Sequence, residues 1–227
     1  YAHGRTADFT LYAQWTLINT YTVTYNANTA SSGTVPTDSN TYATAASVTV
    51  LTNSGTLAKT GYTFAGWCTT QPSAGASCTG TSQAVSSTFT MGSANVTLYA
   101  VWTANTLNVT FDTQGGSSIS PTTTTTGASL STPGTPTRAG YTFNGWFVAS
   151  TGGSALTFAY AHGRTADFTL YAQWTLIAYS ITYDRNFVGK PSDSVVSVNY
   201  GVDALLTKPT DPTRDGYTFA GWSETTS

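Results

Sequence analysis

The stretch at residues 61–67 (GYTFAGW) is the central phrase of this sequence, and it returns at residues 140–146 (GYTFNGW) and 216–222 (GYTFAGW). Two further phrases recur around it. The opening phrase lies at residues 21–28 (YTVTYNAN), 107–116 (LNVTFDTQGG) and 179–186 (YSITYDRN), and the closing phrase at residues 11–15 (LYAQW), 98–102 (LYAVW) and 170–174 (LYAQW). Phrases that recur in a fixed order indicate a tandem array of small domains.

The spacing of the phrases sets the expected boundaries of the repeats. We expect the closing strands of one repeat at residues 1–18, a first complete repeat at 19–103, a second at 104–176 and a third, incomplete repeat at 177–227. Residues 1–18 repeat residues 160–177 without a difference, so we expect the chain to be a fragment of a longer protein. The closing segment of one chain could also complete the third repeat of another by adding a strand, which predicts head-to-tail self-association.

The composition excludes several classes of partner. Only 8% of the residues are charged and the formal net charge is -2, whereas about a quarter of the residues in an ordinary soluble domain are charged. We therefore expect no binding of nucleic acid. No apolar run reaches the roughly 18 residues of a membrane-spanning helix, so no membrane insertion is expected. An aromatic content of 13% argues against disorder.

Alternating residues predict strands. In the first closing phrase, Leu11 and Trp15 fall on one face of an extended segment and polar residues on the other. The threonine run at residues 122–127 (TTTTTG) aligns with residues 196–201 (VSVNYG), whose alternation is that of a strand, so we expect a strand in both places. A single helical turn is expected at most at residues 201–206 (GVDALL).

The three phrases together resemble the Listeria–Bacteroides repeat family, also called the internalin B-repeat. Residues 138–146 (RAGYTFNGW) carry the central pattern of that family, residues 112–116 (DTQGG) its opening and residues 169–174 (TLYAQW) its close. The resemblance covers essentially the whole chain. The first complete repeat departs from the pattern at residues 57–61 (LAKTG), where the family has Pro-Thr-x-x-Gly, and it has a longer loop that contains cysteine.

The resemblance implies a mainly β or small α+β fold. Each repeat is expected to be a β-grasp-like domain, a small twisted sheet with a short helical or irregular crossover, and the repeats are expected to follow one another as beads in a linear array. The family also implies an extracellular location at the bacterial cell surface or in secreted proteins. There the repeats act as spacers and adhesive segments.

Cys68 and Cys78 are the only cysteines of the chain, and nine residues rich in Ser, Gly and Ala separate them. A disulfide would close this loop and stabilise the domain by about 2 to 3 kcal/mol. Free thiols and a metal site are the alternatives, but a zinc site needs four ligands and no histidine or further cysteine lies near. We expect a disulfide, which favours an oxidising, extracellular setting.

Each tryptophan ends a patterned strand at one of two recurring places, which predicts core positions. The six are Trp15, Trp67, Trp102, Trp146, Trp174 and Trp222. The alternative is a carbohydrate-binding face, because aromatic rings stack on sugars. The glycine before Trp67 (Gly66) would suit a β-bulge or a close approach of the backbone. Three tyrosines point away from the tryptophan face and are better candidates for exposed contacts: Tyr12, Tyr99 and Tyr171.

His162, Arg164 and Asp167 lie close together in sequence, and His3, Arg5 and Asp8 repeat them. The cluster could be catalytic, but the first complete repeat has no histidine in this region, so the fold does not need it. A polar loop before the closing strand is the simpler interpretation. Paired glutamates, phosphate-binding loops and nucleophile elbows do not occur. We therefore expect no enzyme activity, no catalytic residues, no metal site and no cofactor.

These observations favour a structural function. We expect a stalk or fibre segment of a large repetitive bacterial surface protein, whose partners are the neighbouring repeats of the same protein. The alternative is a module that binds a glycan or a host protein through exposed tyrosine and threonine faces.

Overall fold

The computed structural model describes residue 4, residues 6–201 and residues 209–224. Within these ranges the chain forms strands and no helix, which confirms the expected mainly β fold. The described residues therefore include no helix that is long and apolar enough to cross a membrane. The helical turn expected at residues 201–206 lies, beyond Gly201, outside the described residues.

The chain divides into two compact units. The first consists of residues 1–106 with residues 125–127, and the second of residues 107–124 with residues 128–227. The second unit therefore groups residues that the sequence assigns to two repeats, and the repeat boundaries given above stay predictions.

The last long strand of the first unit lies in the middle of its main sheet. The sheet has the order β2-β8-β5-β6. β8 is parallel to β2 on one side and antiparallel to β5 on the other. Two short ladders, β1–β3 and β4–β7, complete the unit. Its strands are β1 (Thr20–Tyr21), β2 (Val23–Asn26), β3 (Tyr42–Ala43), β4 (Ser47–Thr49), β5 (Tyr62–Cys68), β6 (Ser82–Gln83), β7 (Thr88–Thr90) and β8 (Val96–Ala104).

The second unit repeats this arrangement in the sheet β10-β9-β14-β12, where β14 is parallel to β9 and antiparallel to β12. The threonine run forms β10, and β16 lies where its counterpart was expected, so both predicted strands are confirmed. The ladders β11–β13 and β15–β16 are antiparallel. The strands are β9 (Thr106–Asp112), β10 (Thr122–Thr125), β11 (Ser129–Leu130), β12 (Tyr141–Phe147), β13 (Tyr160–Ala161), β14 (Phe168–Leu176), β15 (Ala178–Tyr183) and β16 (Ser194–Asn199).

A β-bulge interrupts the central strand of each unit at the same glycine. The register between β5 and β8 shifts between Phe64 and Gly66, and Gly66 has a φ of 121°. The register between β12 and β14 shifts in the same way before Gly145, whose φ is 122°. L-residues other than glycine rarely adopt this conformation, so the expected bulge is confirmed together with the reason for glycine.

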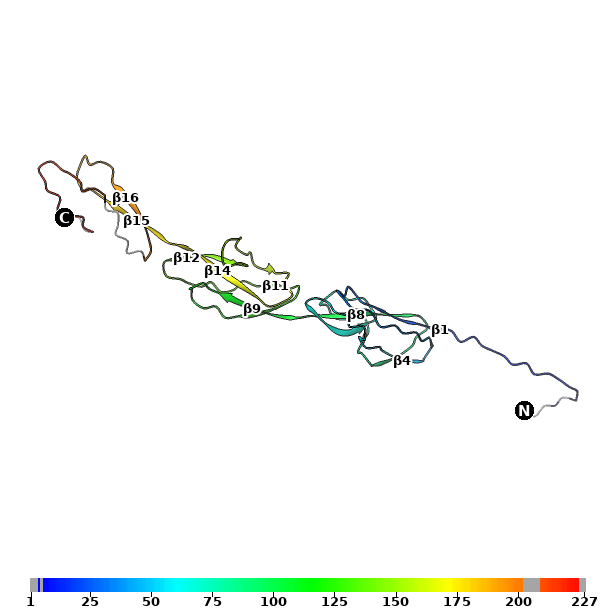
Figure 1. Cartoon of the computed structure of the whole chain (residues 1–227). Helices are drawn as coiled ribbons and strands as arrows, with labels where there is room; N and C mark the ends of the chain where they lie inside the picture. Colours follow the sequence, from blue (N-terminus) through cyan, green and yellow to red (C-terminus); the bar gives the residue numbers. More distant parts are fainter. Residues whose placement is uncertain (1–3, 5, 202–208, 225–227) are drawn as a thin grey trace. The chain divides into compact units, whose positions relative to one another are not determined.

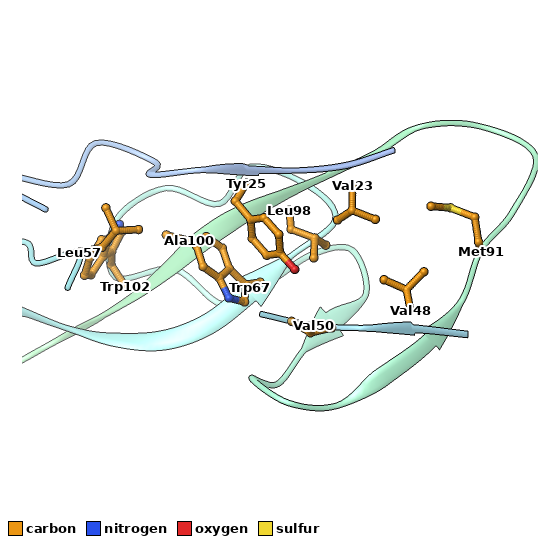
Figure 2. Close-up of a cluster of buried hydrophobic side chains, with 10 residues drawn as sticks. All are labelled: Val23, Tyr25, Val48, Val50, Leu57, Trp67, Met91, Leu98, Ala100 and Trp102. Carbon is orange, nitrogen blue, oxygen red and sulfur yellow. The ribbon is translucent and has the colours of Figure 1, made fainter. Parts of the chain in front are cut away.

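The core of the first unit forms between the main sheet and the β4–β7 ladder. The indoles of Trp67 and Trp102 are fully buried in it, and the ring of Phe64 contacts both in edge-on geometry at 5.1 Å and 5.8 Å. Figure 2 shows the Tyr25 ring against Trp67, with a centroid distance of 4.7 Å. The buried cluster consists of Val23, Tyr25, Val48, Val50, Leu57, Trp67, Met91, Leu98, Ala100 and Trp102.

The core of the second unit uses the same positions. Trp146 is buried, and the ring of Phe111 in β9 lies 5.0 Å from its indole, in the place that Tyr25 takes beside Trp67. Phe143 contacts both Trp146 and the half-buried Trp174, at 5.7 Å and 5.3 Å. The buried cluster consists of Val109, Leu130, Trp146, Leu170 and Ala172.

Trp15 is not a core residue, contrary to the prediction. It is 91% exposed, and the residues before β1 form no strand in the described part of the chain (Figure 1). The physical reason is topological. The identical closing segment of the second unit packs between β9 and β12, and both precede it in sequence. Trp222 is half-buried and contacts the ring of Tyr183.

Candidate functional site: the closing-strand slot

The two main sheets share one structural site, which we call the closing-strand slot. It is the space between the opening and central strands of a repeat, filled by β8 in the first unit and by β14 in the second. The occupying strand forms a parallel ladder on one side and an antiparallel ladder on the other. Its backbone groups are therefore satisfied on both sides, as those of a buried strand must be.

A tight turn after the opening strand forms one end of the slot. In the first unit the Asn26 side chain accepts a hydrogen bond from the Asn28 backbone N–H at 2.8 Å, and in the second Asp112 accepts one from Gln114 at 2.9 Å. Asn28 and Gln114 have positive φ values of 45° and 48°. The side-chain acceptor mimics a backbone turn and stabilises this conformation.

The amide groups of Asn28 and Gln114 lock the closing strand to the loop after the central strand. The Asn28 amide donates to the carbonyls of Ala100 and Pro72, at 2.8 Å and 2.9 Å. The Gln114 amide donates to the carbonyls of Ala172 and Ser150 at 2.7 Å and 2.8 Å. Sequence reasoning treated these residues only as part of a turn. Their signal was an amide side chain at the same place in each opening phrase.

The tryptophan N–H groups form hydrogen bonds inside the units. Trp102 of β8 donates to the Asn28 carbonyl and Trp174 of β14 to the Thr113 carbonyl, each at 2.9 Å. Both therefore tie the closing strand to the turn after the opening strand. A buried indole N–H needs an acceptor, and in both units a carbonyl of this turn provides it.

A polar side chain just before each closing strand binds the opening strand. The Thr22 N–H donates to Asn95 Oδ1 at 2.9 Å. In the second unit the Asn108 N–H and side-chain amide donate to the two carboxylate oxygens of Asp167, at 2.7 Å and 3.0 Å. These two hydrogen bonds hold the pKa of Asp167 below its usual value.

In the third repeat, a cavity of about 940 Å³ lies between β15 and the central phrase. The residues that line it include β15 residues from Ile181 onward and the central phrase up to Trp222. The centroids of the Tyr183 and Trp222 rings lie 5.0 Å apart, and the equivalent rings of the first two repeats lie 4.7 Å and 5.0 Å apart. The Asn186 N–H donates to Asp184 Oδ1 at 2.7 Å and Asn186 has a φ of 54°, so the turn of the slot is already formed.

Cys68 and Cys78 form a disulfide with a Cα–Cα distance of 5.7 Å. Cys68 is the last residue of β5 and is fully buried. The disulfide closes the loop that follows the central strand of the first unit. In the second unit the equivalent position is Phe147, which is also buried and needs no partner.

The polar side chains near His162 have separate structural roles. His162 is buried, its Nδ1 accepts from the Arg164 N–H at 3.0 Å, and its Nε2 lies 3.3 Å from Thr124 Oγ1. Asp167 binds Asn108, and the Arg164 guanidinium lies over the ring of Phe168. His3 and Arg5 lie outside the described residues. Within the described ranges, no group of three or more His, Cys, Asp or Glu side chains could hold a metal ion.

Comparison with known proteins matches the model of the Listeria-Bacteroides repeat domain three times, at residues 21–101, 108–173 and 179–227. A protein named as a Gly-rich membrane protein of Evansella cellulosilytica is 34% identical over 216 residues, 95% of this chain and 23% of that protein. Internalin H of Listeria monocytogenes is 44% identical over 90 residues, 40% of this chain and 15% of that protein. The chain spans less than a quarter of the length of these relatives. The three matches together cover most of its residues, and the chain therefore belongs to the Listeria–Bacteroides repeat domain family.

Proposed function

We propose that this chain is a structural and adhesive segment of a large extracellular protein at the bacterial cell surface, with no enzyme activity of its own. The family and the relatives support this location, since one relative is named a membrane protein and another an internalin. The arrangement of the strands supports a mechanical role. The polar side chains described above are used to hold strands together.

One observation carries the mechanical argument. The opening and closing strands of a complete repeat are parallel neighbours, with Val23 opposite Val96 in the first unit and Val109 opposite Phe168 in the second. A force on the two ends of a repeat pulls these strands in opposite directions along their axes. All hydrogen bonds of the ladder are then loaded at once, and a high force is needed to separate the strands.

Single-molecule pulling through the chain ends tests this proposal. When its slot opens, each complete repeat releases about 70 residues: residues 23–104 in the first, less the ten that the disulfide holds back, and residues 106–176 in the second. A residue spans ~3.3–3.6 Å when extended, so we expect two length increments of up to about 240 Å. The matched control pulls the same domain through cysteines introduced at Thr63 and Thr103, which face each other in the antiparallel ladder β5–β8. That geometry breaks the bonds one after another and should need a lower force. Equal forces in the two geometries would refute a load-bearing role.

A second candidate function is binding of a glycan or a host protein. The Arg138 guanidinium lies 3.8 Å from the centroid of the Tyr141 ring, and Arg214 repeats this stack on Tyr217 at 3.9 Å. A shallow cavity of about 640 Å³ next to the first stack is lined by Arg138, Tyr141 and Trp174, among others. Guanidinium and aromatic groups suit sugar hydroxyls and rings.

The tyrosines of the closing strands contribute less to such a surface than expected. Tyr12 is exposed, but its equivalents Tyr99 and Tyr171 are half-buried.

Screening of the chain against a glycan array, with the Tyr141→Ala variant as the comparison, tests the binding function. Binding of a glycan by the unchanged chain that is lost in the Tyr141→Ala variant would support the binding function. If the unchanged chain binds no glycan on the array, the result counts against a glycan ligand.

A further inference from the structure

We infer that the cavity beside Arg138 in the second repeat is a binding site for a carboxylated sugar, such as a hexuronic acid unit of an acidic polysaccharide. The inference rests on the second candidate function, glycan binding, and names the class of glycan. The cavity has a volume of about 640 Å³, and all of its lining residues belong to the second repeat. Sites for small ligands in proteins have volumes of roughly 300 to 1,000 Å³, so a sugar unit fits.

The Arg138 guanidinium carries a charge that no carboxylate of the described residues neutralises. Both ion pairs in this part of the chain involve Lys190 instead. The guanidinium is nevertheless fixed in place, because it stacks on the Tyr141 ring at 3.8 Å and its Nη1 donates to the Gln114 carbonyl at 3.0 Å. Its remaining N–H groups are left for a ligand. A fixed guanidinium with such donors fits the two oxygens of a carboxylate.

The aromatic wall of the cavity is covered in the first repeat and open in the second. Trp102 is 1% exposed, and the loop after β5 lies against it, with the Gly75 N–H donating to the Trp102 carbonyl at 2.9 Å. A Cβ atom on Gly75 would lie 3.6 Å from the ring of Tyr62, the equivalent of Tyr141. The second repeat has a shorter connection here, and its Trp174 is half-buried and lines the cavity. The apolar face of a sugar ring can therefore contact this indole.

The equivalent cation of the first repeat is used inside the fold. Lys59 takes the place of Arg138, and its Nζ donates to the backbone carbonyl and the hydroxyl group of Thr29, each at 2.8 Å. A lysine also lacks the planar pair of donors that matches a carboxylate. We therefore expect the site in the second repeat and not in the first.

Two amide side chains fix the loop that borders the cavity. The Gln114 amide donates to the Ser150 carbonyl at 2.8 Å. The Gln173 amide donates to the carbonyls of Ala149 and Gly152, at 3.1 Å and 2.8 Å. The border of the site is therefore ordered before a ligand arrives, and little conformational freedom is lost on binding.

Asp112 also lines the cavity, and it provides an acceptor for sugar hydroxyl groups. Its Oδ1 accepts the hydrogen bond from the Gln114 N–H, which leaves the second carboxylate oxygen for a ligand. Asp112 is exposed, so water and salt screen its repulsion of an anion. The cavity thus combines one cation for a carboxylate, one acceptor for hydroxyl groups and an aromatic surface, which together match a hexuronic acid.

Calorimetric titration of the whole chain with two acidic hexasaccharides, one of galacturonic acid and one of hyaluronan, tests the inference. The matched ligands are the same hexasaccharides with their carboxyl groups reduced to alcohols, which keeps the ring hydroxyls and removes the charge. We expect at least one acidic form to bind, and its reduced form to bind roughly 10- to 100-fold more weakly, because the charge-assisted hydrogen bonds to Arg138 are lost. The two acidic forms separate a plant-type from an animal-type polysaccharide. If neither binds, the inference is overturned.

Substitution of Arg138 tests the location of the site. Arg138→Gln should lower the affinity for the acidic form roughly 10- to 100-fold. Arg164→Gln is the matched control and should leave it unchanged, because Arg164 lies in the same unit but over Phe168 and outside the cavity. Thermal melting shows whether each variant is folded. Arg138→Lys keeps the charge without the planar fork, so it should also bind more weakly, and it provides the test if Arg138→Gln does not fold. A folded Arg138 variant with unchanged affinity would overturn the inference.

The inference and the functions proposed above fail under different results. A chain that binds the acidic and the reduced hexasaccharides equally well would sink the carboxylate site and leave glycan binding in place. A chain that binds none of these ligands and no glycan on the array would sink both. The mechanical role depends on neither result, because the pulling experiment tests it separately.

Discussion

Leu170 and Leu11 offer a matched pair of substitutions that tests how the closing strand stabilises a repeat. Both lie in the same 18-residue sequence, so the effect of a change on the unfolded chain is the same at the two sites. They differ in the folded chain, because Leu170 is buried between β9 and β12 whereas Leu11 is exposed. Substitution of each by alanine therefore isolates the contribution of packing in the slot.

The expected magnitude for Leu170→Ala follows from its burial. A fully buried Leu→Ala change removes apolar contact and leaves a cavity, and such changes cost about 2 to 5 kcal/mol. Leu170 packs in the same cluster as Val109 and Trp146, so we expect a loss near the middle of that range, about 3 kcal/mol. Exposed substitutions fall within about 0.5 kcal/mol, which is the expectation for Leu11→Ala.

Scanning calorimetry of dilute chain measures both effects. A loss of about 3 kcal/mol in a domain of 60–100 residues lowers Tm by roughly 12 to 24 °C. Only the transition of the second unit should move in Leu170→Ala, and hydrogen exchange at β12 identifies that transition. The first unit provides the internal reference. The reasoning would be refuted by an equal Tm loss in the two variants, or by no Tm loss in Leu170→Ala.

Three further predictions concern the other stabilising features. Reduction of the Cys68–Cys78 disulfide should lengthen the pulling increment of the first unit by about 30 Å, because ten residues at ~3.3–3.6 Å replace a span of 5.7 Å; an unchanged increment would show that no disulfide shields the loop. The lowered pKa of Asp167 means that its contribution to stability is present above the unfolded-state pKa of about 3.9 and is lost as pH falls through the lower folded-state pKa. Urea unfolding should therefore show a smaller acid-side stability loss in Asp167→Asn than in the unchanged chain, and equal pH profiles would contradict the Asn108 contacts. Gly145→Ala must hold a φ of 122° and should destabilise the second unit by about 1 to 3 kcal/mol in thermal melts, whereas a stabilised variant would contradict the bulge.

Much of the fold could be predicted because the repeats within the chain can be aligned with one another. The threonine run at residues 122–125 has no hydrophobic alternation of its own, yet its place relative to the third repeat identified it as β10. The glycine of the central phrase predicted the bulge at Gly66, because the same residue type stands beside each tryptophan at 67, 146 and 222.

The exposure of Trp15 was missed because a side chain is buried only when neighbouring strands cover it, and the alternation of residues within one strand does not show which strands lie beside it. The identical phrase at residues 170–174 packs in a core only because β9 and β12 lie on either side of it. The bridging amides were missed for a related reason. Asn28 contacts Ala100, which is 72 residues away in sequence, and only the parallel pairing of β2 with β8 brings them together.

The position of the closing strand explains why one element matters both for resistance to force and for the integrity of the sheet. It is the last strand of a repeat in sequence but lies in the interior of the sheet, between β9 and β12 in the second unit. Without it, the opening and central strands cannot pair with each other, because the slot separates them by one strand width of about 4.8 Å on each side. The strand that resists extension of a repeat is therefore also the strand that joins the two halves of its sheet.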